Sequence, residues 1–196
     1  MNFRLSLLLD KLKSSSLDGL LVSKEANVSY LSHFKTSDSY LLVTPKETVF
    51  ITDFRYTQQA RKYVEGFRVF KYKDLFADIA GLAARLKIKR LGFESKDLRF
   101  AEYIRIKEYL PKKIKLIETF GIIDSLRGIK DAGEIKFIKD AVKITADAFN
   151  FLEDYLKPGR TELEVAGEVE RFIRYRGAQA SAFNIIVASG PNSSYP

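Results

Sequence analysis

The sequence contains no cysteine and no tryptophan, and its 196 residues include a single histidine and a single methionine. The absence of cysteine excludes disulfide bonds, zinc sites with cysteine ligands and a thiol nucleophile. The histidine is His33, and the serine run at 14–16 has no base beside it, so a Ser–His–Asp triad has no support. No run of 18 apolar residues occurs, and the sequence therefore predicts no transmembrane helix and no membrane partner.

Apolar residues are abundant. They make up 46% of the chain and include 15 phenylalanines, a composition that predicts a packed core rather than disorder. A chain of this length accommodates one large domain, or one domain and part of another. Near the N-terminus, Leu5, Leu8 and Leu12 recur at helical spacing, and the charges of Asp10 and Lys11 follow early. Both features indicate an amphipathic helix rather than a signal peptide.

The net charge of +8 is unevenly distributed. Residues 1–128 contain 24 Lys and Arg against 15 Asp and Glu, whereas residues 129–196 contain 9 against 10. Such asymmetry occurs in nucleic-acid-binding proteins, so a basic N-terminal interaction module is one interpretation. We prefer an ordinary solvated surface without a nucleic-acid partner, because the basic residues are spread over many elements and the densest run is short, at 87–90.

Helical and strand-like segments alternate through about residue 125. The predicted helices are 2–16, 24–32, 56–64, 75–86 and 100–109, and the predicted strands are 17–22, 39–44, 48–52, 67–72, 90–94 and 113–118. This alternation with short connections predicts an α/β domain with a mixed sheet and helices on both faces. Pro45 presets a hairpin turn, which supplies the antiparallel part of the sheet. Residues 121–130 are expected to be a linker.

The pattern then changes to long helices. Apolar spacing predicts a helix over 131–156, and a capping box at Thr161 and Glu164 begins the next one. An apolar strand is expected at 183–189, followed by a turn. These elements cannot enclose a core alone, so we expect domains at 1–125 and 126–196, the second incomplete, and a chain that is the front part of a longer protein.

Four segments carry motifs in a fixed order. They read N-V-S-Y-L-S-H-F at 27–34, T-D-F-R-Y-T-Q-Q-A at 52–60, R-G-I-K-D-A-G-E-I at 127–135 and F-N-I-I-V-A-S-G, with its turn and final proline, at 183–196. Together they resemble the creatinase/prolidase/aminopeptidase P group of "pita-bread" metallopeptidases. The resemblance implies an N-terminal α/β domain with a ribonuclease H-like sheet, followed by the start of a pita-bread α+β catalytic domain.

The same resemblance implies a function. Members of this group are Xaa-Pro dipeptidases or aminopeptidases that hydrolyse short peptides with proline at the second position, using a hydroxide bridging two divalent ions (Mn, Co or Zn). The implied ligands are two Asp, one His and two Glu that lie beyond residue 196, so we expect neither a catalytic residue nor a bound metal in residues 1–196. A homodimer is expected, and the lack of cysteine fits the cytoplasm.

Three residues are candidates for substrate contact. The resemblance implies that the phenylalanine at the start of the last motif, here Phe183, lines the substrate pocket. The alternative is a core phenylalanine at a strand end. The N-domain loop 32–38, with His33 and Asp38, corresponds to a loop that reaches the partner subunit's active site, although the group commonly has glycine at position 33. The alternative is a plain helix-to-strand connection.

Other polar residues are given structural interpretations. Asp53 precedes a helix and is expected to cap it, and Arg55 is expected to form an ion pair within the domain or at its interface. Carboxylates after residue 130, Glu162 among them, are expected on solvated helix faces. The turn at 189–194 is expected either to be a simple turn or to direct the following residue into the active site.

Two further functions stay open at this point. A creatinase-type hydrolase of the same fold, or a binding homologue that has lost its metal, would carry the same motifs in residues 1–196.

Overall fold

The computed structural model describes residues 3–195. Asn2, the first residue of the predicted N-terminal helix, and Pro196, the last residue of the fourth motif, lie outside these described residues. The chain forms two compact units, Met1–Ile129 and Lys130–Pro196, which we call the first and the second unit and describe separately.

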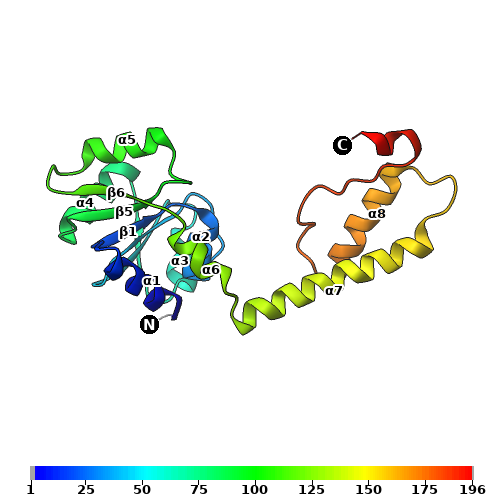
Figure 1. Cartoon of the computed structure of the whole chain (residues 1–196), viewed down its shortest axis with the longest axis horizontal. Helices are drawn as coiled ribbons and strands as arrows, with labels where there is room; N and C mark the ends of the chain where they lie inside the picture. Colours follow the sequence, from blue (N-terminus) through cyan, green and yellow to red (C-terminus); the bar gives the residue numbers. More distant parts are fainter. Residues whose placement is uncertain (1–2, 196) are drawn as a thin grey trace. The chain divides into compact units, whose positions relative to one another are not determined.

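The first unit is built around a β-sheet (Figure 1). The sheet has six strands in the order β4-β3-β2-β1-β5-β6. Strand β2 is antiparallel to both of its neighbours, and the other pairs are parallel. The mixed α/β sheet predicted from the sequence is therefore confirmed, including the hairpin at Pro45. The strands are β1 (Gly19–Val22), β2 (Tyr40–Val43), β3 (Thr48–Thr52), β4 (Arg68–Lys71), β5 (Arg90–Glu94) and β6 (Lys115–Thr119).

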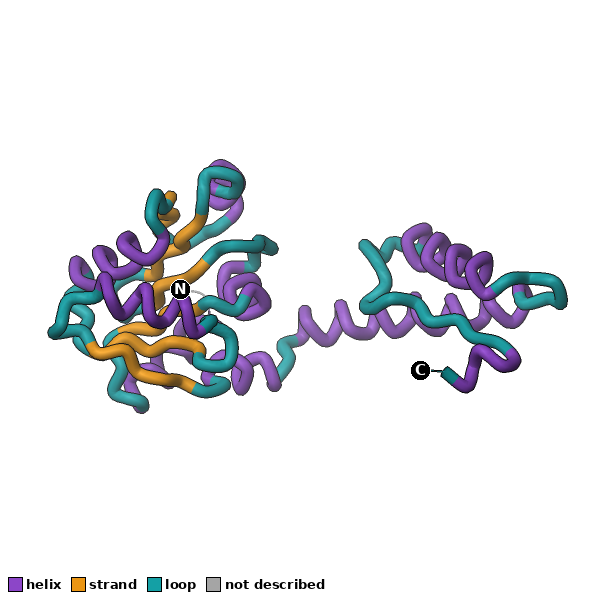
Figure 2. Tube along the Cα trace, turned by 90° about the horizontal axis from the view of Figure 1, so that it is seen from above, coloured by secondary structure: helices purple, strands orange, loops and turns teal. Residues whose placement is uncertain are grey.

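Helices cover both faces of this sheet (Figure 2). Each face has its own core. Side chains alternate along β1, so that Leu20 and Val22 enter one core and Leu21 enters the other. The core on the Leu20 side also receives side chains from α1 (Phe3–Ser14), α2 (Glu25–Ser32), α3 (Thr57–Tyr63) and α6 (Ile122–Gly128). The core on the Leu21 side receives them from α4 (Leu75–Arg85) and α5 (Phe100–Tyr109).

The prediction of a linker at 121–130 is wrong, because helix α6 occupies most of this segment. Ile123 is 1% exposed and belongs to the first core, while Ile122 and Leu126 pack against that core. Their spacing gives this short segment an apolar face, and Gly121 begins it with a left-handed φ of 62°. Residues 122–128 are thus part of the first unit.

The second unit is a helix pair followed by an irregular segment. Helices α7 (Ala132–Tyr155) and α8 (Glu162–Tyr175) confirm the predicted helices, and the capping box forms as expected, with Thr161 and Glu164 hydrogen-bonded reciprocally. The rings of Phe151 and Phe172 stack with centroids 4.7 Å apart, which joins the two helices.

The strand expected at 183–189 is wrong. Within the described residues of the second unit there is no strand, and residues 182–189 run as an irregular segment before a 3-10 helix, η1 (Gly190–Ser194). A strand needs a neighbour for its N–H and C=O groups, and the described residues 130–195 supply none. Among residues 3–195, no helix combines the length and apolar character that a membrane crossing needs.

Candidate functional site

The loop between α2 and β2 contains two of the predicted substrate residues, His33 and Asp38. Helix α2 ends at Ser32, and both His33 and Asp38 adopt left-handed backbone conformations, with φ of 55° and 53°. Both side chains are exposed. A non-glycine residue with positive φ is uncommon, so the loop has a specific conformation that its surroundings must maintain.

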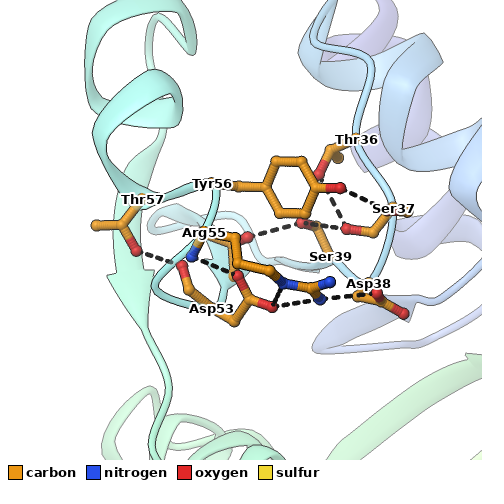
Figure 3. Close-up of polar contacts among 9 residues, drawn as sticks. Thr36, Ser37, Asp38, Ser39, Asp53, Arg55, Tyr56 and Thr57 are labelled. Carbon is orange, nitrogen blue, oxygen red and sulfur yellow. Dashed lines mark hydrogen bonds and ion pairs between the residues drawn. The ribbon is translucent and has the colours of Figure 1, made fainter.

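Hydroxyl groups fix this loop to the end of β3 (Figure 3). Ser39 Oγ lies 2.9 Å from Thr36 Oγ1 and 2.8 Å from Thr52 Oγ1, and all three residues are buried. Ser37 Oγ shares a further hydrogen bond of 2.7 Å with the hydroxyl of Tyr56. The loop is therefore held by satisfied, largely buried hydrogen bonds rather than by apolar packing alone.

Arg55 ties the same loop to the turn after β3. Its Nε donates to Asp53 Oδ2 over 2.7 Å, and its Nη2 donates to Asp38 Oδ2 over 2.8 Å (Figure 3). Burial of Asp53 opposes ionisation, but hydrogen bonds from the side chain and backbone of Arg55 outweigh it, and the pKa of Asp53 lies below its ordinary value. The expectation that Arg55 pairs within its domain is confirmed.

The expectation that Asp53 caps a helix is corrected. Its Oδ1 accepts the backbone N–H of Arg55, two residues on, over 2.8 Å, which closes a turn ahead of the helix. Helix α3 begins at Thr57, and its first-turn bond runs to the Asp53 carbonyl instead. The carboxylate thus competes successfully for the nearest N–H group, as short acidic side chains do in turns.

A second polar cluster lies where parallel strands β1 and β5 end. Glu94 accepts hydrogen bonds from the backbone N–H groups of Ser23 and Lys24, at 2.8 and 2.9 Å, and from Asn27 Nδ2 at 2.5 Å. Burial raises the pKa of the Glu94 carboxyl. The amide oxygen of Asn27, Oδ1, accepts a hydrogen bond from Arg127 Nη1 of α6 over 2.9 Å. The Ser23 hydroxyl is buried without a hydrogen-bond partner among residues 3–195, while the hydrogen bonds of Glu94 and Asn27 join β5, α2 and α6 structurally.

Phe183, the third predicted substrate residue, lies in the irregular segment of the second unit and is 77% exposed. Both interpretations of Phe183, a substrate contact and a core phenylalanine of the full-length protein, stay open. The structure brings Asp38 together with Arg55 and Asp53 in the first unit, and it leaves His33 exposed on the same loop. Phe183 belongs to the other unit.

Glu162 is half-exposed, and the sequence interpretation missed its hydrogen bonds to the turn at 189–192. Its Oε1 accepts the backbone N–H of Ser189 over 2.6 Å, and Asn192 Nδ2 lies 3.1 and 3.0 Å from its two oxygens. Partners 27 and 30 residues away leave no periodic signal in the sequence. Glu162 therefore attaches the 189–192 turn to the first residue of α8.

A metal centre does not fit the described part of the chain. Across residues 3–195, no group of three or more His, Asp and Glu side chains is arranged so that it could hold a metal ion. The side chains around Asp38 are hydroxyls and the guanidinium of Arg55, which is an unsuitable donor set for two divalent cations. The ions implied by the family resemblance are therefore not assigned to these residues.

Comparison with known families gives two matches. Residues 4–129 match the family model described as Creatinase/Prolidase N-terminal domain, and residues 136–196 match the model described as Metallopeptidase family M24. The two matches fall on the first and the second unit respectively.

Individual relatives agree with these matches. The chain is 36% identical to an uncharacterized peptidase of Bacillus subtilis (strain 168), YqhT, over 92% of this chain and 51% of the relative. It is similar in structure to an Xaa-Pro dipeptidase from Bacillus anthracis, with a TM-score of 0.90 and 34% identity, over 98% of this chain and 54% of that one. It is also similar in structure to an X-Pro aminopeptidase from Thermotoga maritima MSB8, with a TM-score of 0.85 and 32% identity, over 98% of this chain and 55% of that one. The chain spans about half the length of these proteins.

Proposed function

Because the chain belongs to the creatinase/prolidase N-terminal domain family, we propose that the full-length protein is a metal-dependent peptidase that cleaves short peptides at an Xaa-Pro bond. The observation that carries this proposal is the similarity to a protein named as an Xaa-Pro dipeptidase, which extends through both units rather than the N-terminal one alone. A similar structure named as an aminopeptidase supports either class of Xaa-Pro enzyme.

The chemistry of the substrate explains why a dedicated pocket is needed. An Xaa-Pro bond is a tertiary amide without an N–H donor, so peptidases that bind that donor handle it poorly. The exposed ring of Phe183 offers an apolar face for the proline ring. His33 and Asp38 are proposed to contact substrate from an N-domain loop that hydrogen bonds and Arg55 hold in place.

The metal and the assembly belong to the full-length protein. Two divalent ions, Mn, Co or Zn, would be held by residues outside those described here, and no catalytic step is assigned to residues 3–195. A homodimer would let the loop of one subunit reach the active site of its partner. A cytoplasmic location is part of the proposal, and the similarity to the N-terminal domain of a protein named as a cytoplasmic peptidase from Mycobacterium tuberculosis supports it.

The test is a metal-dependent activity assay on the purified full-length protein. Stripped of metal by a chelator, it should lose cleavage of an Xaa-Pro dipeptide and regain it with Mn²⁺, Co²⁺ or Zn²⁺, whereas the matching Xaa-Ala dipeptide should be cleaved poorly. Longer Xaa-Pro peptides then separate an aminopeptidase from a dipeptidase. Failure to cleave any Xaa-Pro peptide with all three ions would reject the proposal, and hydrolysis of creatine instead would select the creatinase-type alternative.

Phe183→Ala provides the site-level arm of the same assay. Loss of the ring should raise KM for Xaa-Pro substrates, because the apolar contact with proline is removed. An unchanged KM would remove Phe183 from the substrate pocket while leaving the activity proposal intact.

A further inference from the structure

The segment that carries Phe183 is attached to α8 through Glu162. Glu162, at the start of α8, accepts the Ser189 N–H, and Asn192 Nδ2 lies within hydrogen-bond distance of both of its carboxylate oxygens. The segment has no strand partner among the described residues.

The turn held by Glu162 is itself rigid. Asn192 donates its backbone N–H to the Ser189 carbonyl over 3.2 Å, and the hydroxyls of Ser193 and Ser194 donate to the Gly190 and Pro191 carbonyls, each over 2.7 Å. Proline at 191 fixes a further backbone angle. A rigid turn attached through a carboxylate has a fixed position and a fixed direction of exit.

We propose that Glu162 is a positioning residue of the substrate site: its carboxylate fixes the 189–192 turn, and thereby places the segment with Phe183 on one side of the turn and the residues that follow it on the other. This rests on the proposed function, because the segment is taken to line the Xaa-Pro site. Glu162 itself contacts no substrate in this proposal, since its oxygens are used by Ser189 and Asn192.

A charge-swapped pair tests the contact in the full-length enzyme. Glu162→Gln keeps an oxygen that accepts the Ser189 N–H. Its new NH2 group faces the NH2 group of Asn192, so two donors meet and one hydrogen bond is lost. Asn192→Asp places a second carboxylate against Glu162. In the double variant, the new amide at position 162 donates to the new carboxylate at position 192, and the complementary arrangement is restored. Glu168→Gln is the matched control, because Glu168 is on the same helix and pairs with Arg171.

Two measurements are made on all four variants. Hydrogen–deuterium exchange reports on the Ser189 amide directly, and kinetics on an Xaa-Pro dipeptide reports on the site. Each single variant of the pair should exchange faster at 189–192 and lose about tenfold to a hundredfold in kcat/KM, the range that a small misplacement of substrate-contacting groups produces. The double variant should recover to within about threefold of the wild type, and Glu168→Gln should match the wild type.

Several results would overturn the proposal: unchanged exchange at 189–192, wild-type kinetics despite faster exchange, or no recovery in the double variant. A loss of activity that follows a lowered melting temperature would assign Glu162 a general structural role instead. The proposed function fails separately, if the wild-type enzyme cleaves no Xaa-Pro peptide. The exchange pattern then decides by itself whether Glu162 fixes the turn.

Discussion

Arg55 Nη2 lies 2.8 Å from Oδ2 of Asp38, a residue 17 positions earlier in the chain. The same guanidinium binds Asp53 at the end of β3, so one arginine joins the α2–β2 loop to the core sheet. Asp38 and His33 are both exposed on that loop and both are proposed substrate contacts. The ion pair therefore links the geometry of the proposed substrate loop to the rigid part of the first unit.

Arg55→Met should weaken substrate binding by the full-length enzyme, in addition to the stability lost with its bond to Asp53. The loop loses its attachment to the turn after β3, so its substrate-contacting residues are held less well, and we expect KM for an Xaa-Pro dipeptide to rise about two- to fivefold. Arg85→Met is the matched control, because the Arg85 side chain is equally exposed, at 51%, and pairs with Glu47 away from the loop. Equal KM values for both variants would contradict a role of the loop in substrate binding.

Asp53→Asn should reduce stability in a pH-dependent way. The pKa of Asp53 is lowered in the folded state, so its contribution is present above the unfolded pKa of about 3.8 and is lost as the pH falls through the lower folded pKa. We expect the variant to be less stable by about 1–2 kcal/mol at pH 7, since the buried carboxylate loses its charge-assisted bond to Arg55.

Urea unfolding at pH 7, 5 and 3 measures this difference. The gap between wild type and Asp53→Asn should stay constant from pH 7 to 5 and shrink at pH 3. Asp10→Asn, a substitution of an exposed aspartate on α1, is the comparison and should cost less at pH 7. A gap that is the same at pH 3 and pH 7 would argue against the ion pair as its source.

Local patterns predicted most of the first unit. Strands β3 and β5 begin and end at the predicted residues, because flanking turn and loop residues mark the ends of each short run. The two wrong predictions, the linker at 121–130 and the strand at 183–189, depend on contacts with residues that are distant in the sequence. The expected linker has an apolar face that only the core of the first unit reveals, and residues 183–189 have strand composition but no partner among the described residues.

The candidate site was predicted less completely. The exposed loop with His33 and Asp38 and the pairing of Arg55 followed from the motifs, whereas the identity of the Arg55 partner did not. Asp38 and Arg55, or Glu162 and Ser189, meet through folding of segments that are far apart in the sequence. Periodicity reports which face of an element is buried, and it carries no information on such polar contacts.

Asn27→Ala should be strongly destabilising. Asn27 is fully buried and joins Glu94 to Arg127, so its removal leaves a half-buried carboxylate and a half-buried guanidinium each short of a partner. We expect a loss of about 2–3 kcal/mol in unfolding free energy. Asn27→Asp should be worse at pH 7, because it places a second carboxylate beside Glu94. Gln58→Ala, an exposed amide on α3, is the control, and a similar loss there would rule out this account.

Two glycines should respond to alanine in opposite directions. Gly81 is exposed within α4, a Cβ there meets nothing within 4 Å, and Gly81→Ala should stabilise the protein by about 0.5–1 kcal/mol through higher helix propensity. Gly92 is in β5, where a Cβ would lie 2.9 Å from Leu17 Cδ1 and 3.0 Å from Leu20 Cδ1. Because Leu20 is fully buried and has little room to move, Gly92→Ala should cost about 1–3 kcal/mol. Urea unfolding of both variants measures the two effects, and changes of the same sign would contradict the close packing of β5 against this core.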